Sequence, residues 1–192
     1  DGGYAIYFTA RVNNAQKISG GKYFSGTGDV PRIWEAGKDA EASLPDDLSA
    51  TQLRPGISPK PDFTFSDVNG SPVSIKDGRF KNKVIIIQLM GSWCPNCMDE
   101  TVFLNEIYRK YKPKGVEIIG LAYERTEDFS RSQRSVQNFI KRLKVEYPVL
   151  IPPVAVGDPE NARKTLPQLE KITAFPTTVF VDRKGEIQKI HA

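Results

Sequence analysis

The chain has 192 residues, of which 39% are hydrophobic and 26% charged, proportions that are ordinary for a soluble globular protein. Its net charge of +4 is too small an excess to predict a nucleic-acid partner. Its two cysteines are too few for a disulfide-scaffold protein, and no apolar run reaches the roughly 18 residues that a membrane span needs.

Residues 1–56 differ in pattern from the rest of the chain. Strand-like runs at residues 4–9 and 22–25 flank four turn-forming residues: Asn13, Asn14, Gly20 and Gly21. Residues 34–56 are rich in small, acidic, proline and glycine positions and predict a linker with one or two helical turns at most. Because a lone hairpin is marginal in water, we interpret residues 1–56 as an extension formed by the end of a β-rich domain and a linker.

From residue 57 onward, regular α/β patterning predicts a second domain over residues 57–192. Strands are expected at 62–67, 73–75, 84–90, 116–123, 147–151, 177–182 and 186–191. Helices are expected at 95–111, 127–145 and 159–172, the last of them started or divided by Pro167. This order predicts a mixed central sheet with parallel crossovers, flanking helices and a closing hairpin.

Cys94 and Cys97 follow a predicted buried strand and open a predicted helix. At a helix start, unpaired N–H groups and the helix dipole stabilise a thiolate, so Cys94 is the expected nucleophile, with a lowered pKa and solvent access. Pro95 suits the first helical position because it has no N–H to lose. Cys97 lies one turn further on the same side and is the expected resolving thiol. The alternative is that both are ordinary buried cysteines.

No metal site is expected. A tetrahedral zinc site needs four Cys or His ligands, and the chain has a single histidine, His191. We therefore expect no cofactor beyond the redox-active Cys94–Cys97 pair.

The motif Trp93-Cys94-Pro95-Asn96-Cys97 resembles the thioredoxin superfamily, and within it the TlpA/ResA-like periplasmic thiol–disulfide oxidoreductases. Two further segments resemble the same family: Phe175-Pro176-Thr177-Thr178, which precedes a predicted strand, and the turn Asp182-Arg183-Lys184-Gly185. It covers about residues 57–192 and implies a thioredoxin-like fold. It also implies a further helix after the last hairpin, which this sequence does not contain.

The resemblance implies that Pro176 is a cis proline beside the disulfide. The backbone next to it would then be free to pair with an extended client segment. The expected client-binding positions are Trp93, Pro95, Phe175 and Thr177.

Glu100 matches a glutamate of the family that influences cysteine ionisation and proton transfer. A nearby carboxylate raises the pKa of a thiol and can accept its proton. The alternative is a solvated carboxylate in the first turn of the helix. Gln88 replaces the buried aspartate of thioredoxins proper and cannot take a proton.

The resemblance implies a reductase of client disulfides in the periplasm or cell envelope, tethered to the membrane by a segment outside this sequence. Its partners would be client proteins and an upstream thiol donor, which can itself be membrane-bound. No nucleic-acid partner is expected. The residues leave both directions of electron flow open.

Two alternative functions fit the residues less well. A thiol peroxidase would carry P-x-x-x-[ST]-x-x-C, but Ile87 and Gly91 stand at the first two motif positions before Cys94. A copper-handling or binding module could use two thiolates, but its relatives have C-x-x-x-C and a distal histidine.

Overall fold

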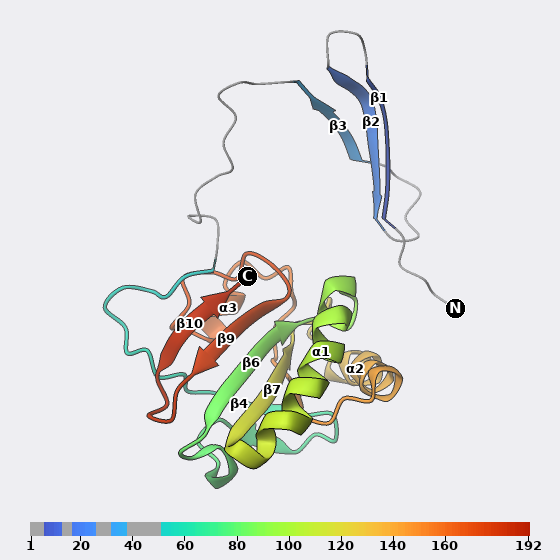
Figure 1. Cartoon of the computed structure of the whole chain (residues 1–192). Coiled ribbons are helices and arrows are strands. Elements are labelled where there is room, and N and C mark those ends of the chain that lie inside the picture. The colour runs from blue at the N-terminus through green and yellow to red at the C-terminus, as the bar shows by residue number, and fades with distance from the viewer. Residues whose placement is uncertain (1–5, 13–16, 26–31, 38–50) are drawn as a thin grey trace. The chain divides into compact units, whose positions relative to one another are not determined.

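The computed structural model describes residues 6–12, 17–25, 32–37 and 51–192 (Figure 1). The chain divides into two compact units, residues 1–46 and 47–192. The amide of Arg54 bonds to the carbonyl of Gln168, and the amide of Glu170 bonds to the carbonyl of Gln52. Residues 52–54 therefore pack with the second unit, although their composition predicted a linker.

The first unit contains a three-stranded antiparallel sheet in the order β1-β2-β3. Its strands are β1 (Ile6–Val12), β2 (Ile18–Ser25) and β3 (Arg32–Ala36). The predicted linker, residues 34–56, begins inside β3, so the sequence pattern did not predict this strand. Gly20 and Gly21 lie within β2 and not in a turn, while Asn13 and Asn14 lie outside the described residues. Gly21 lets Trp34 pack close, because a Cβ there would lie 2.5 Å from the indole.

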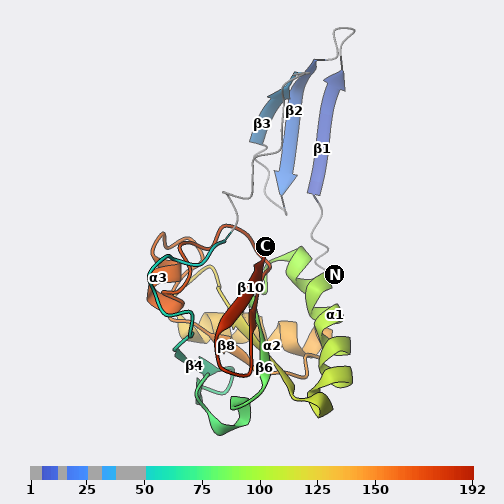
Figure 2. The same cartoon turned by 60° about the vertical axis from the view of Figure 1, so that its left-hand side comes forward.

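The second unit is built on a seven-stranded mixed sheet in the order β10-β9-β6-β7-β8-β4-β5 (Figures 1 and 2). Its strands are β4 (Thr64–Asp67), β5 (Pro72–Ser74), β6 (Val84–Met90), β7 (Val116–Ala122), β8 (Val149–Ile151), β9 (Thr177–Val181) and β10 (Ile187–His191). Strands β6, β7 and β8 are parallel, and β9 runs antiparallel to β6. The predicted α/β architecture is confirmed.

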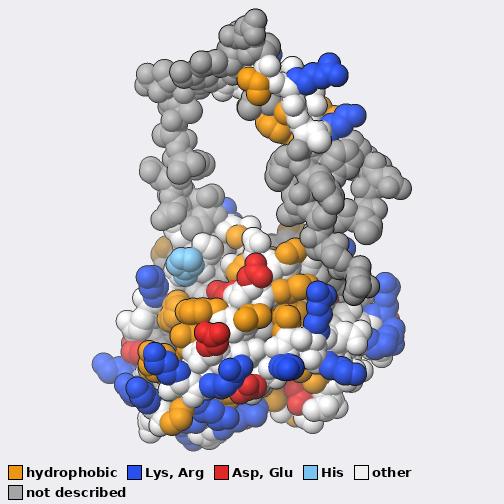
Figure 3. All heavy atoms as spheres, turned by 45° about the vertical axis from the view of Figure 1, so that its right-hand side comes forward, with side chains coloured by type: hydrophobic (Ala, Val, Ile, Leu, Met, Phe, Trp, Pro, Cys, Tyr) orange, Lys and Arg blue, Asp and Glu red, His pale blue; other side chains and the backbone are white. Residues whose placement is uncertain are grey.

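The helices of this unit are α1 (Pro95–Tyr111), α2 (Phe129–Leu143) and α3 (Asn161–Thr165), with 3-10 turns at Gly78–Phe80 and Lys112–Lys114. α3 ends before Pro167 and is much shorter than the predicted helix over 159–172, since proline cannot continue a helix. No helix in the described part of the chain is long and apolar enough to cross a membrane. Figure 3 shows lysine and arginine side chains over the lower part of this unit, with carboxylates among them, as expected of a solvated surface.

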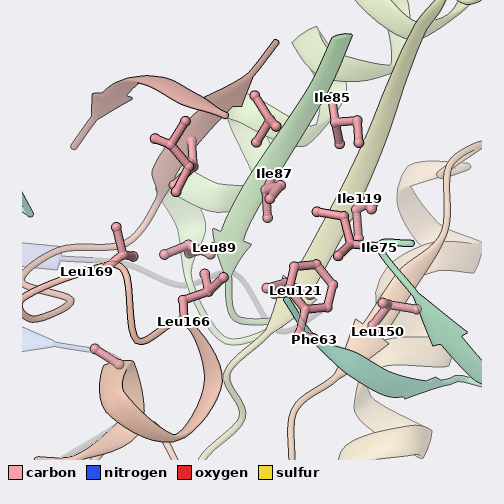
Figure 4. Packing of buried hydrophobic residues seen from close by; sticks show 14 of the residues in the cluster. Phe63, Ile75, Ile85, Ile87, Leu89, Ile119, Leu121, Leu150, Leu166 and Leu169 are labelled. Carbon is pink, nitrogen blue, oxygen red and sulfur yellow. The ribbon is translucent and has the colours of Figure 1, made fainter. Parts of the chain in front are cut away.

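β6 is buried on both faces, which explains its continuous apolar run. Ile85, Ile87 and Leu89 pack into one cluster with Leu166 and Leu169 beyond α3 (Figure 4). The alternate residues Ile86 and Met90 pack into a second cluster, which contains residues of α1 and α2 and both cysteines. The core therefore holds the end of β6, and with it the start of α1, in one place.

Candidate active site

A tight turn connects the end of β6 to α1. The amide of Cys94 bonds to the carbonyl of Gly91 at 3.0 Å, so residues 91–94 close a β-turn with Ser92 and Trp93 in its centre. Gly91 is needed here, because a Cβ would lie 2.3 Å from the indole nitrogen of Trp93. Cys94 then caps α1, with Pro95 in its first turn.

The two cysteines are close together and both are buried. The Sγ of Cys94 accepts a hydrogen bond from the amide of Cys97 at 3.3 Å, the capping interaction expected at a helix start. Cys97 is fully buried and Cys94 is only 4% exposed. The expectation of solvent access at Cys94 is therefore wrong, because the sulfur packs in a cluster that Trp93 and Phe175 border.

The two thiols are electrostatically unlike. A hydrogen bond from the Cys97 thiol, helped by backbone N–H groups, lowers the pKa of Cys94 to about 7, although burial opposes this. The same thiol–thiol bond, together with burial, strongly raises the pKa of Cys97. Cys94 is therefore the group that forms a thiolate near neutral pH.

The loop before β9 faces Cys94. Its sulfur lies 3.6 Å from the carbonyl oxygen of Phe175, and the Phe175–Pro176 peptide bond is cis. The rings of Trp93 and Phe175 meet edge to face, with centroids 5.8 Å apart. Both side chains are only half-buried, so they offer apolar surface beside the thiol. Thr177 is fully buried, and its hydroxyl donates to the carbonyl of Ala174, so its side chain supports the loop.

Glu100 belongs to a hydrogen-bond network behind Cys97. Its carboxylate accepts from Nε2 of Gln88 at 2.8 Å and from the hydroxyl of Thr178 at 2.6 Å. Tyr147 donates to Oε1 of Gln88 at 3.1 Å, which orients the amide toward Glu100. The charge of Glu100 raises the pKa of both cysteines. These bonds do not fit the alternative of a freely solvated carboxylate.

Sequence reasoning missed Glu124 and Arg125, which follow β7 and meet the active-site turn. Glu124 is 5% exposed and accepts two hydrogen bonds from Ser92. The guanidinium of Arg125 lies 5.4 Å from the centre of the Trp93 ring. Their position directly after a predicted parallel strand is a signal that could have found them, because the carboxyl ends of adjacent parallel strands meet at one sheet edge. Among the residues that the structure describes, no group of three or more His, Cys, Asp or Glu side chains could hold a metal ion.

Residues 58–192 match the family model of Redoxin. This chain belongs to the Redoxin family. The chain is 32% identical over 127 residues to the thiol–disulfide oxidoreductase ResA of Bacillus thuringiensis, covering 66% of this chain and 64% of that protein. ResA of Bacillus subtilis is 26% identical over 133 residues, covering 69% and 65%.

Solved structures agree on the fold of this Redoxin-family chain. A thiol:disulfide interchange protein of the thioredoxin family from Chlorobium tepidum matches with a TM-score of 0.56 and 25% identity, over 73% of this chain and 88% of that one. The thioredoxin domain of a thiol–disulfide oxidoreductase from Bacteroides vulgatus matches with a TM-score of 0.57 and 25% identity, over 73% and 90%. The predicted thioredoxin-like fold and the likeness to ResA are confirmed.

Proposed function

We propose that this chain is a thiol–disulfide oxidoreductase that reduces disulfides of client proteins. The observation that carries the proposal is Cys94, which caps α1 with a lowered pKa, next to Cys97 and facing the loop of Phe175 and Pro176. The ResA relatives and the thiol:disulfide interchange structures support the same chemistry.

The exchange proceeds in two displacements. The Cys94 thiolate attacks one sulfur of a client disulfide, forming a mixed disulfide and releasing the other client sulfur as a thiolate, which takes up a proton. Cys97 then loses its proton and attacks Sγ of Cys94. The client leaves as a dithiol with two electrons, and the Cys94–Cys97 disulfide remains for an upstream thiol donor to reduce.

Cys97 is activated by the first displacement. The largest cause of its raised pKa is the hydrogen bond that it gives to Cys94. Once Cys94 is part of a mixed disulfide, no thiolate remains to accept that bond, so the pKa of Cys97 falls. Glu100, held by Gln88 and Thr178, is the carboxylate placed to receive the proton.

The client would bind as an extended segment. The backbone before Pro176 lies against Cys94, and the half-buried rings of Trp93 and Phe175 border that position. A client strand that pairs with this loop would bring its disulfide over Cys94, with Pro95 at the edge of the contact.

The pKa of Cys94 favours a reductase. Strongly oxidising members of this fold have a nucleophile pKa of about 3.5, whereas reducing thioredoxin has one of about 7. Cys94 matches the reducing case. We place this activity in the periplasm or cell envelope, where client disulfides form, with an upstream thiol protein as the electron donor.

The test is insulin reduction with dithiothreitol as electron source, run beside a peroxide-consumption assay. The wild type should reduce insulin, Cys94→Ser should abolish this, and Cys97→Ser should form a trapped mixed disulfide. A protein that consumes peroxide but leaves insulin oxidised would be a peroxidase, and one that does neither would be a binding module. Either result would overturn the proposal.

A further inference from the structure

Glu124 is a buried carboxylate that the exchange chemistry does not use. It lies just beyond the end of β7 and is 5% exposed. Burying a carboxylate is costly unless hydrogen bonds satisfy it. Within the described part of the chain, the side-chain oxygens of Glu124 have one bonding partner, Ser92, and make no ion pair.

Both carboxylate oxygens are bonded to this one residue of the active-site turn. Oε1 accepts from the amide of Ser92 at 2.7 Å, and Oε2 accepts from its hydroxyl at 2.8 Å. Hydrogen bonds to a charged acceptor are about twice as strong as neutral ones, and a two-point attachment fixes orientation as well as position. Ser92 is therefore held in both place and direction.

The neighbours of Glu124 bind the next residue of the same turn. The indole of Trp93 donates to the carbonyl oxygen of Tyr123 at 2.9 Å, and Arg125 lies over its ring. The amide of Tyr123 in turn bonds to the carbonyl of Met90, where β6 ends. The turn between β6 and α1 is thus tied to three consecutive residues after β7.

We propose that Glu124 is a positioning residue, which holds the β-turn of residues 91–94 through Ser92 and thereby sets Cys94 in its capping position on α1. Ser92 and Trp93 are the two central residues of this turn, and its closing bond comes from the amide of Cys94. Movement of Ser92 therefore displaces Cys94, whose Sγ must stay 3.3 Å from the amide of Cys97 to keep its stabilising bond.

The experiment measures the Cys94 thiolate by absorbance titration and iodoacetamide labelling of the reduced full chain. Glu124→Ala should raise the pKa of Cys94 by about one unit, because one hydrogen bond to a charged group is of that size. Starting from a pKa of about 7, labelling at pH 7 should become about fivefold slower. Ser92→Ala, which keeps the amide bond, should have a smaller effect in the same direction.

Two further variants separate positioning from general stability. Glu124→Gln should keep the Cys94 pKa, because the amide can accept from the Ser92 N–H and donate to its hydroxyl. Glu117→Gln is the matched control, since Glu117 is a buried carboxylate at the other end of the same strand, bonded to Lys83 and Tyr108. It should lower the free energy of unfolding and leave the Cys94 pKa unchanged.

The double variant Ser92→Ala/Glu124→Ala should shift the pKa no further than Glu124→Ala alone. A folded Glu124→Ala protein with the wild-type pKa, or an equal shift in Glu117→Gln, would overturn the proposal. Should Glu124→Ala not fold, an unchanged pKa in Ser92→Ala would do the same. The inference gives the proposed function a positioning device, but its readout needs no client. A wild type that fails to reduce insulin would overturn the function and leave this result to stand.

Discussion

Replacing Glu100 by glutamine should make Cys94 more acidic. The carboxylate raises the pKa of both cysteines through its charge, and glutamine removes that charge while keeping the side-chain size. Glu100 lies six positions after Cys94, the N-cap of α1, which corresponds to a rise of about 9 Å along the helix axis. At an effective dielectric constant of about 20, a unit charge at that distance contributes about 1.8 kcal/mol before screening, or somewhat over one pKa unit.

Solvent screening reduces this effect because Glu100 is only half-buried. We therefore expect the pKa of Cys94 to fall from about 7 by about half to one unit in Glu100→Gln. At pH 7 the thiolate fraction would rise from about half to about three-quarters or nine-tenths. The reduced form is then favoured about two- to fivefold, which makes the reduction potential about 10–20 mV less negative.

The assay is a thiolate-absorbance titration of wild type and variant, with the potential measured in a glutathione buffer. Asp99→Asn is the matched control, because Asp99 is an exposed carboxylate in the same helical turn. It should leave both quantities nearly unchanged. Superimposable curves for wild type and Glu100→Gln, or an equal shift in Asp99→Asn, would refute the reasoning that the charge of Glu100 raises the pKa of Cys94.

Three further results are expected. In the reduced protein iodoacetamide should label Cys94 much faster than Cys97, and mass mapping that finds equal rates would contradict the assignment. The folded pKa of Cys94 lies below its usual value of 9.0, so its contribution to stability is present above pH 9 and is lost as the pH falls through about 7. The free energy of unfolding of the reduced protein should therefore rise by up to about 2 kcal/mol from pH 6 to pH 9, and Cys94→Ser should flatten this slope in chemical denaturation. Gly91→Ala should destabilise the protein by about 1–3 kcal/mol, because the new methyl group displaces the indole of Trp93, and an unchanged denaturation midpoint would contradict this.

Local patterns in the sequence were sufficient for the strands and the two long helices of the second unit and for the cysteine pair, but not for the length of α3. The continuous apolar run of β6 and Pro95 at the start of α1 both express backbone preferences of neighbouring residues. The position of Cys94 at a helix start follows from the same local information. Strand pairing within the first unit does not follow from local information. The strand β3 was not predicted because its place depends on the packing of Trp34 over Gly21 of another strand.

Only the tertiary structure decided the surroundings of the two thiols. Glu100 meets Thr178, which is 78 residues further along the chain, and Ser92 meets Glu124 across 32 residues. Burial of Cys94 likewise depends on the distant loop of Phe175. The sequence by itself determined which residues carry the chemistry, because secondary structure and helix capping act over a few residues. Sheet order and helix packing determined their partners, because those contacts join segments whose local sequences carry no record of one another.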